Sequence, residues 1–198
     1  MRLQAWPGLA ALAGLVAVLG ACTSPPPVAA GAPAPLAPGA ERAERVAEAL
    51  VMAARAESAK DAAALQQAAA RLARLGAQAQ TPEDGQAMAR WREALPADPA
   101  AMRGRALGPA YRSGRLGPGA SQQLNQTFLG GRSAQVVLKV ARGPTPRLEV
   151  RDQAERQVCR PVATDPVKCR WVPLYTQRHI IEIANTGLEA SEFYIVFD

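Results

Sequence analysis

The C-terminal half of the chain alternates apolar and polar residues with a period of two. Across residues 133–141, polar side chains such as Gln135 and Lys139 interrupt a row of apolar ones. The same alternation runs through residues 179–183 and 193–197. Successive side chains of a β-strand point to opposite faces of a sheet, so each stretch predicts a half-buried strand.

Shorter stretches of the same kind lie between turn residues and complete the set of predicted strands: 124–129, 147–151, 157–160 and 168–172. The total of about seven short strands at this spacing is typical of a β-sandwich. We therefore predict an all-β domain over residues 120–198.

Residues 41–95 show helical periodicity instead. Before Gly76, large apolar residues recur at helical spacings among many alanines: Val46, Leu50, Leu65, Leu72 and Leu75. This pattern predicts either one long helix or two joined helices. The helical segment and the sandwich together give an α+β fold.

A further helix is predicted to begin at Thr81 and Pro82, a capping residue followed by proline in the first turn. Met88, Trp91 and Leu95 would share one face of it. We expect the helical segments to form an antiparallel hairpin. Its apolar stripe is mostly alanine, so it needs another surface to pack on. That surface is either a neighbouring part of this chain or a partner protein, and the sequence leaves both open.

The N-terminus has the layout of an export signal. Arg2 precedes an apolar run from Leu9 to Leu19, and no charged residue intervenes before Cys22. A transmembrane helix needs about 20 apolar residues, and this run is shorter. Residues 1–22 are therefore predicted to be a signal peptide.

The end of this run, Leu19-Gly20-Ala21-Cys22, resembles the lipobox of bacterial lipoprotein precursors. The resemblance implies cleavage before Cys22 and attachment of lipid to its thiol. Thr23 stands where an aspartate would favour retention in the inner membrane. We expect a protein anchored by lipid to the outer membrane and facing the periplasm. An ordinary secretory signal that happens to contain a cysteine is the alternative.

Two proline-rich stretches flank the predicted helices. Residues 23–40 are dense in proline and alanine, which favours an extended tether of about 3 Å per residue. Residues 96–119 are rich in proline, glycine and arginine, and are interpreted as a linker. After removal of residues 1–22, which hold one charge, 22 basic and 17 acidic residues remain. The basic residues are scattered, so no nucleic-acid partner is expected.

The cysteines support an oxidising compartment. Of the three, Cys22 is assigned to lipid, which leaves Cys159 and Cys169 as the one pair able to form a disulfide. Two free, buried thiols are the alternative. A zinc site is not expected, because His179 is the single histidine and no further cysteine remains.

Signatures of catalysis are missing from the sequence. It contains no Gly-x-Ser-x-Gly elbow, phosphate-binding loop or zinc-protease helix. His179 lies in a predicted strand and is interpreted as a structural or surface histidine. Asp152 and Asp165 are interpreted as turn residues. We therefore expect no catalytic residue, no metal, no cofactor and no enzymatic activity.

The C-terminal region resembles the bacterial pre-peptidase C-terminal family over residues 107–198. The resemblance is carried by several segments: Leu116-Gly117-Pro118-Gly119, Leu124 to Phe128, Leu148-Glu149-Val150-Arg151-Asp152, Cys159, Cys169-Arg170-Trp171-Val172-Pro173, Ile180 to Asn185 and Phe193-Tyr194-Ile195. It implies a jelly-roll-like sandwich of the kind often appended to exported proteins. Members commonly carry acidic residues before the strand at 148–152. Residues 143–146 are Gly-Pro-Thr-Pro here, so calcium binding is not carried over.

These observations favour a non-catalytic function. We expect a membrane-anchored module that binds an envelope protein or a glycan. The alternative is a structural or assembly factor of a cell-envelope complex.

Overall fold

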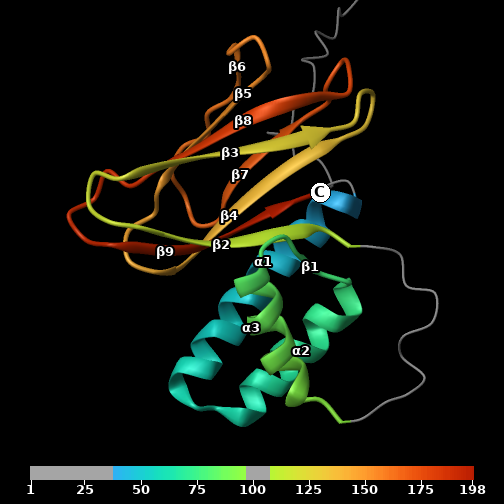
Figure 1. Cartoon of the computed structure of the whole chain (residues 1–198), viewed down its shortest axis with the longest axis vertical. Coiled ribbons are helices and arrows are strands. Elements are labelled where there is room, and N and C mark those ends of the chain that lie inside the picture. The colour runs from blue at the N-terminus through green and yellow to red at the C-terminus, as the bar shows by residue number, and fades with distance from the viewer. Residues whose placement is uncertain (1–37, 97–107) are drawn as a thin grey trace, which may run out of the picture. The chain divides into compact units, whose positions relative to one another are not determined.

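The helices of the chain are joined by short, well-capped connections. The computed structural model describes residues 38–96 and 108–198, and Figure 1 shows their arrangement. The helices are α1 (Pro38–Ala59), α2 (Ala62–Leu75) and α3 (Pro82–Glu93). The segment before Gly76 therefore forms two helices, which was one of the two alternatives. None of the helices in the described part of the chain is long and apolar enough to cross a bilayer. The predicted lipid site, Cys22, lies outside the described residues.

Local signals explain where the helices break. Lys60 has a positive φ of 56°, and the Asp61 side chain then accepts a hydrogen bond from Ala64 N at 2.9 Å to start α2. Gly76, with φ of 70°, ends α2 in the left-handed conformation that glycine adopts without strain. The predicted Thr81 cap is confirmed, because its side chain accepts a hydrogen bond from Asp84 N.

Nine strands within the described residues form two sheets. A five-stranded sheet has the order β1-β2-β9-β4-β7, and a four-stranded sheet has the order β3-β8-β5-β6. The strands are β1 (Gln78–Ala79), β2 (Ala110–Leu116), β3 (Ser121–Phe128), β4 (Ala134–Arg142), β5 (Arg147–Arg151), β6 (Gln157–Cys159), β7 (Val167–Trp171), β8 (Gln177–Ala184) and β9 (Ser191–Phe197). Every pairing is antiparallel except that of β1 with β2. The fold is thus an α+β β-sandwich, as predicted.

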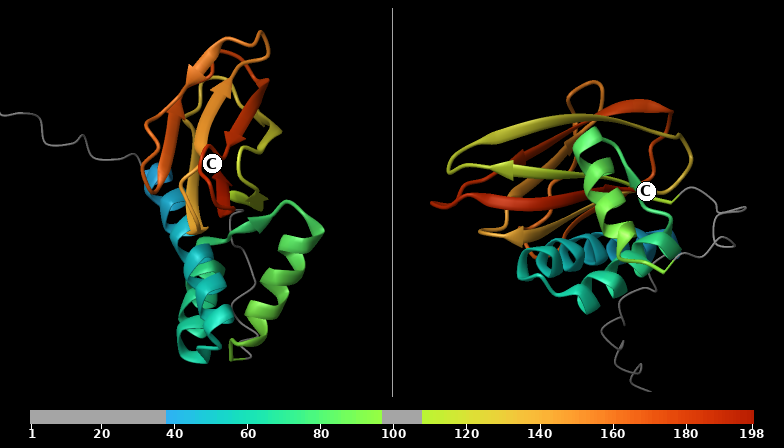
Figure 2. Two further views of the ribbon diagram at one scale, coloured as in Figure 1. Left: turned by 90° about the vertical axis from the view of Figure 1, so that its left-hand side faces the viewer. Right: turned by 60° about the horizontal axis from the view of Figure 1, so that its bottom comes forward.

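The two faces of the five-stranded sheet bury different partners. Val136 and Ile195 point into the core between the two sheets. Val137 and Val196, one residue further on, belong to a second core that contains Leu50 and other residues of the helices. The helical stripe therefore packs on this chain's own sheet, and Figure 2 shows the helices against that sheet. This settles the choice of packing surface that the sequence left open.

Asp84 connects α3 to strand β2 through hydrogen bonds. Its carboxylate accepts hydrogen bonds from Ser113 N at 3.1 and 3.2 Å and from the Thr81 hydroxyl at 2.7 Å. The Tyr111 hydroxyl donates to the carbonyl of Asp84 at 3.2 Å. Burial, followed by the nearby Asp84 charge, raises the pKa of Tyr111, so this phenol stays protonated.

The structure differs from the sequence prediction at two strands. Strand β2 lies inside the range 96–119 that was interpreted as a linker, and the short β1 was not predicted. The alternation in β2 is obscured by Ser113 and Gly114. A side chain at Gly114 would collide with the Phe193 ring, since its Cβ would lie 2.4 Å from Phe193 Cζ. Position 114 must therefore be glycine, and the apolar residue that would have shown the alternation of β2 is not found there.

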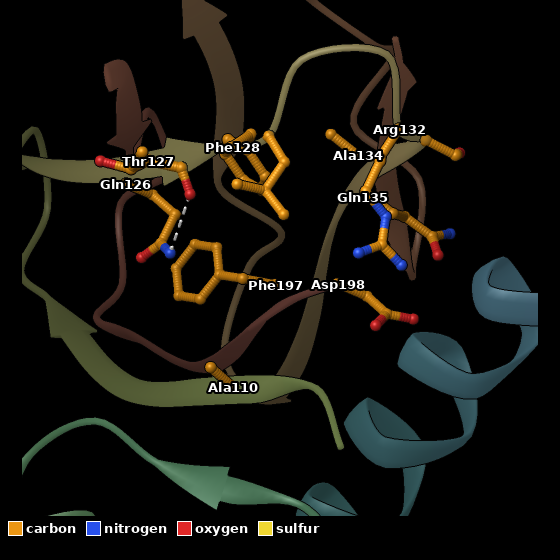
Figure 3. A pocket seen from close by; sticks show the side chains of 11 residues that line it. Ala110, Gln126, Thr127, Phe128, Arg132, Ala134, Gln135, Phe197 and Asp198 are labelled. Carbon is orange, nitrogen blue, oxygen red and sulfur yellow. Dashed lines mark hydrogen bonds between the residues drawn. The ribbon is translucent and has the colours of Figure 1, made fainter. Parts of the chain in front are cut away.

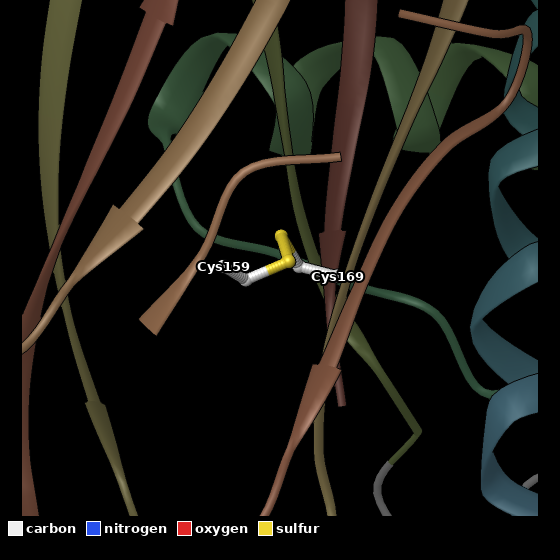
Figure 4. Close-up of a disulfide and its surroundings, with 2 residues drawn as sticks. All are labelled: Cys159 and Cys169. Atoms are coloured by element: carbon white, nitrogen blue, oxygen red, sulfur yellow. A yellow bond between two sulfur atoms is a disulfide. The ribbon is translucent and has the colours of Figure 1, made fainter. Parts of the chain in front are cut away.

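Cys159 and Cys169 form a disulfide, as predicted. The bond joins β6 at the edge of one sheet to β7 at the edge of the other, with the two Cα atoms 5.9 Å apart (Figure 4). Cys169 is fully buried against the core between the sheets. The crosslink therefore closes this side of the sandwich.

We predict that Cys159→Ser lowers the free energy of unfolding by about 2–3 kcal/mol, because a closed loop of this length restricts the unfolded chain. Urea denaturation with and without a reductant measures the effect. The native chain should lose stability on reduction, whereas the variant should not respond. Equal urea midpoints of the native chain under both conditions would contradict the prediction.

Candidate functional site

Two loops lie side by side at the end of the sandwich where β3 ends and β4 begins. One joins β3 to β4 and the other joins β7 to β8. Gly131 N donates to Pro173 O at 2.8 Å, and Gly130 N donates to the Thr176 hydroxyl at 3.0 Å. A Cβ at Gly130 would lie only 2.8 Å from the Tyr175 backbone, so the close approach requires glycine. The two loops therefore form one surface.

Large apolar side chains on these loops face solvent. Leu174 is 83% exposed and Tyr175 is 75% exposed, and Leu129 and Val172 are also exposed. We call these four residues the apolar loop patch. Single exposed apolar residues are common, but a group on two contacting loops is typical of an interaction surface.

A pocket of about 480 Å³ opens beside Leu129. Figure 3 shows that Phe128, Phe197 and Ala110 form its apolar wall, and that Arg132, Gln135 and Asp198 lie together on the other side. The residues come from β2, β3, β4, the end of β9 and the loop between β3 and β4. The pocket thus combines apolar contact area with a few polar groups, as ligand sites do.

Gln135 is the most unusual residue of this pocket. Its side chain is only 4% exposed, and its Oε1 atom has no hydrogen-bond partner. Its backbone is fixed, because its N–H and C=O groups both pair with Asp198 at 2.8 and 3.0 Å. A buried acceptor without a donor costs about 1–3 kcal/mol. A ligand that donates a hydrogen bond to Gln135 would remove that cost if the side chain turned its buried oxygen toward the pocket.

The charged groups of the pocket have opposite signs. The surrounding protein desolvates the Asp198 carboxyl and raises its pKa, and the positive charge of Arg42 opposes this shift. Arg132 supplies hydrogen-bond donors on the same wall. The site therefore offers acceptors and donors together, which suits a ligand such as a peptide or amide. Among the residues that line it there is no histidine or cysteine to act as a base or nucleophile.

His179 is a buried structural residue that lies beneath this surface. It is 1% exposed, and its ring packs against the rings of Phe128 and Trp171. Trp171 Nε1 donates to His179 Nε2 at 3.2 Å, and His179 Nδ1 lies 3.2 Å from Gln177 O. Both ring nitrogens are therefore engaged in the neutral form. Burial lowers the pKa of His179, although the Gln177 carbonyl and the Asp152 charge oppose that shift.

The two candidate acids occupy turns, as interpreted from the sequence. Asp152 accepts hydrogen bonds from the backbone N–H groups of Ala154 and Arg156, both at 2.9 Å. Asp165 accepts one from Val140 N at 3.3 Å. Neither residue lines the pocket.

Sequence reasoning missed the pocket residues. Arg132 and Asp198 carry no motif, and Gln135 was noted only as a polar residue in an alternating strand. Its neighbours on the same face of β4 are Val137 and Lys139, and nothing in this pattern indicated a function for the amide of Gln135. The one available signal was a neutral polar residue at the start of a strand whose first seven residues hold only one other polar side chain, Lys139.

No family model matches the sequence, and no curated protein matches it. Solved structures with similar folds include a periplasmic inhibitor of g-type lysozyme, PliG, from Aeromonas hydrophila, at 8% identity and a TM-score of 0.37. The match covers 46% of this chain and 84% of that chain. The pre-peptidase C-terminal domain of a Bacillus anthracis collagenase has 6% identity and a TM-score of 0.39, with coverage of 46% and 89%. A de novo designed double-stranded β-helix has 15% identity and a TM-score of 0.30, with coverage of 44% and 97%.

We predict that stability falls as the pH drops below about 6.5, the ordinary pKa of histidine. The unfolded chain then binds a proton that the folded chain resists at His179, so acid favours unfolding. Urea denaturation at several pH values measures the slope. The variant His179→Phe should show a smaller slope between about pH 7 and pH 5. Identical slopes for the two proteins would show that His179 is not held neutral by the fold.

Proposed function

We propose that the protein is a lipid-tethered, non-catalytic binding module that faces the periplasm and holds an envelope protein or glycan at the pocket end of its sandwich. The observation that carries this proposal is the unpaired, buried Oε1 of Gln135 in a pocket beside the apolar loop patch. Together they provide a polar anchor and a desolvating surface, which are the two parts of a typical interface.

The composition of the surface favours a protein over a glycan. Leu129, Val172 and Leu174 offer exposed aliphatic area that a hydrophilic polymer would leave in water. A protein partner would cover this area and place a donor group against Gln135. The proposal includes no reaction, because the hydroxyls of Thr127 and Ser133 have no histidine among the residues that line the pocket.

The N-terminal sequence supports the proposed location. The lipobox-like segment ending at Cys22 and the proline-rich residues that precede α1, 23–37, are consistent with a lipid anchor and a tether. A disulfide between Cys159 and Cys169 is typical of an oxidising compartment such as the periplasm. We propose the outer membrane as the site of anchoring, because Thr23 follows the cysteine.

The anchor is tested by Cys22→Ser. In cells fed a clickable palmitate analogue, the native chain should carry the label and sediment with outer-membrane vesicles. The variant should lose the label, because no other residue near the cleavage site offers a thiol. Cys159→Ser is the matched control and should keep the label. A native chain without label, or one found in the cytosol, would refute the anchor.

Binding at the pocket end is tested by photocrosslinking in living cells. A photoreactive amino acid at Leu174 should give a discrete protein adduct. The same amino acid at Leu188, a 96% exposed residue between β8 and β9 at the opposite end of the strands, should not. The adduct should weaken in the background of Gln135→Leu, which keeps the size of the side chain and removes the acceptor. Equal adducts from both positions would contradict a binding site at this end.

A further inference from the structure

The sandwich has two lateral sides, each bounded by one edge of each sheet, and these two sides differ. On one side, the disulfide joins the edge strands β6 and β7. On the other side, β3 is the edge of the four-stranded sheet and has no strand beyond it within the described residues. Strand β1 covers only Ala110 and Tyr111 of β2. The Gln80 side chain reaches from the end of β1 to Gln126 of β3, at 3.1 Å, which places both edges on one open side.

Strand β3 lacks the features that usually protect an edge. It runs for eight residues, Ser121–Phe128, in unbroken register with β8. Its sequence holds no charged residue and no proline, and the pairing shows no bulge. Natural edge strands are usually shortened, bulged or charged, because unpaired backbone groups attract other strands. An unprotected edge of this length is therefore a ready template for a further strand.

The free backbone groups can be assigned from the ladder. Asn185 N donates to Ala120 O at 2.9 Å, so residues 120, 122, 124 and 126 bond toward β8. The N–H and C=O groups of Ser121, Gln123 and Asn125 then point to the open side. Thr127 belongs to the same row, and its carbonyl is approached at 3.5 Å only by the neighbouring Gln126 side chain. Figure 3 shows this contact at the rim of the pocket.

The charges around this edge are positive. Arg178 stands opposite Thr127 on β8, and Arg132 lines the pocket at the end of β3. Arg112 lies in β2 on the side that faces the other sheet, since its neighbour Tyr111 points to the helices. None of the three forms an ion pair in the part of the chain that the structure describes. The nearest acid on β8, Glu182, is already paired with Arg151.

We propose that β3 accepts an extended, acidic segment of a partner protein as an added strand of the four-stranded sheet. The partner's backbone would bond to Ser121, Gln123 and Asn125, and its acidic side chains on the outer face of the sheet would meet Arg178, with Arg132 at the end of the strand and Arg112 on the opposite face. A second copy of this chain is a poorer occupant, because it would bring more arginines and no acid to the edge.

The added strand continues into the site described above. A segment that follows β3 past Thr127 reaches the mouth of the pocket, which Gln126, Thr127 and Phe128 help to form. One of its amide or side-chain donors then faces Gln135. The inference rests on the proposed function, because the same partner is held at the pocket and along the edge.

Hydrogen exchange on the full chain tests the strand directly. The probe is a peptide of about ten residues that alternates valine with glutamate, a length that covers the edge. It should slow exchange at the amides of Ser121, Gln123 and Asn125, whereas Gln122 and Leu124 are already bonded to β8. A matched peptide with lysine in place of glutamate should not. Equal protection by both peptides, or none at these three amides, would overturn the proposal.

A backbone variant separates the edge from the side chains. Gln123→Pro removes one outward N–H and leaves the ladder with β8 intact, so it should weaken binding of the acidic peptide about tenfold or more. Gln123→Ala keeps the N–H and should bind as the native chain does. Arg178→Glu should weaken binding of the acidic peptide and strengthen binding of the lysine peptide. This variant replaces the proline variant as the test if the latter is unstable. Equal affinities of the proline and alanine variants would exclude strand addition.

The two proposals can fail separately. If the Leu174 adduct persists unchanged in Gln123→Pro, the partner binds at the pocket end without using the edge. If the acidic peptide protects the edge but Leu174 and Leu188 give equal adducts, the edge binds a strand and the proposed site is wrong. A dimer in sedimentation that Gln123→Pro dissociates would assign the edge to a second copy and would also overturn the inference.

Discussion

The rest of the structure depends on two strands, β4 and β9, that are apolar on both faces. Val136 and Ile195 fill the space between the sheets, while Val137 and Val196 would lie bare on the outside without the helices. Covering them removes apolar area from water, which is the main favourable term in folding. Helix α1 meets this need with alanines and a few larger residues, so it can approach the sheet closely. The helices and the sandwich therefore pack together as one compact unit.

The packing of the helices on the sheet determines which surfaces of the sandwich remain accessible to a partner. The helices take the outer face of one sheet, and the disulfide closes one side of the sandwich. The outer face of the other sheet is polar, where Arg151 bridges Glu149 and Glu182. Among residues 38–96 and 108–198, the side bounded by β3 and the loop end with its pocket stays uncovered. The candidate site lies where the packing of the chain leaves polar groups unpaired and apolar groups uncovered.

The sequence predicted secondary structure best where one-sided burial produces a regular alternation of apolar and polar residues along the chain. Strands such as β8 bury one face at every second residue, and the alternation reveals them. Strand β2 was missed because Gly114 makes room for Phe193, a constraint that exists only in three dimensions. The disulfide followed from cysteine number and compartment. The pocket did not, because Arg132, Gln135 and Asp198 are brought together by strand pairing between β4 and β9 and share no local pattern.

The disulfide has a consequence for assembly. A sheet that is open at both edges can add neighbours in either direction and grow into a filament. In this chain the bond between Cys159 and Cys169 leaves growth possible in one direction alone. A strand added along β3 would find the edges β6 and β7 joined to each other on the far side of the sandwich, so chains could not add in both directions. Limited assembly would then be a second effect of the crosslink, beside its effect on stability.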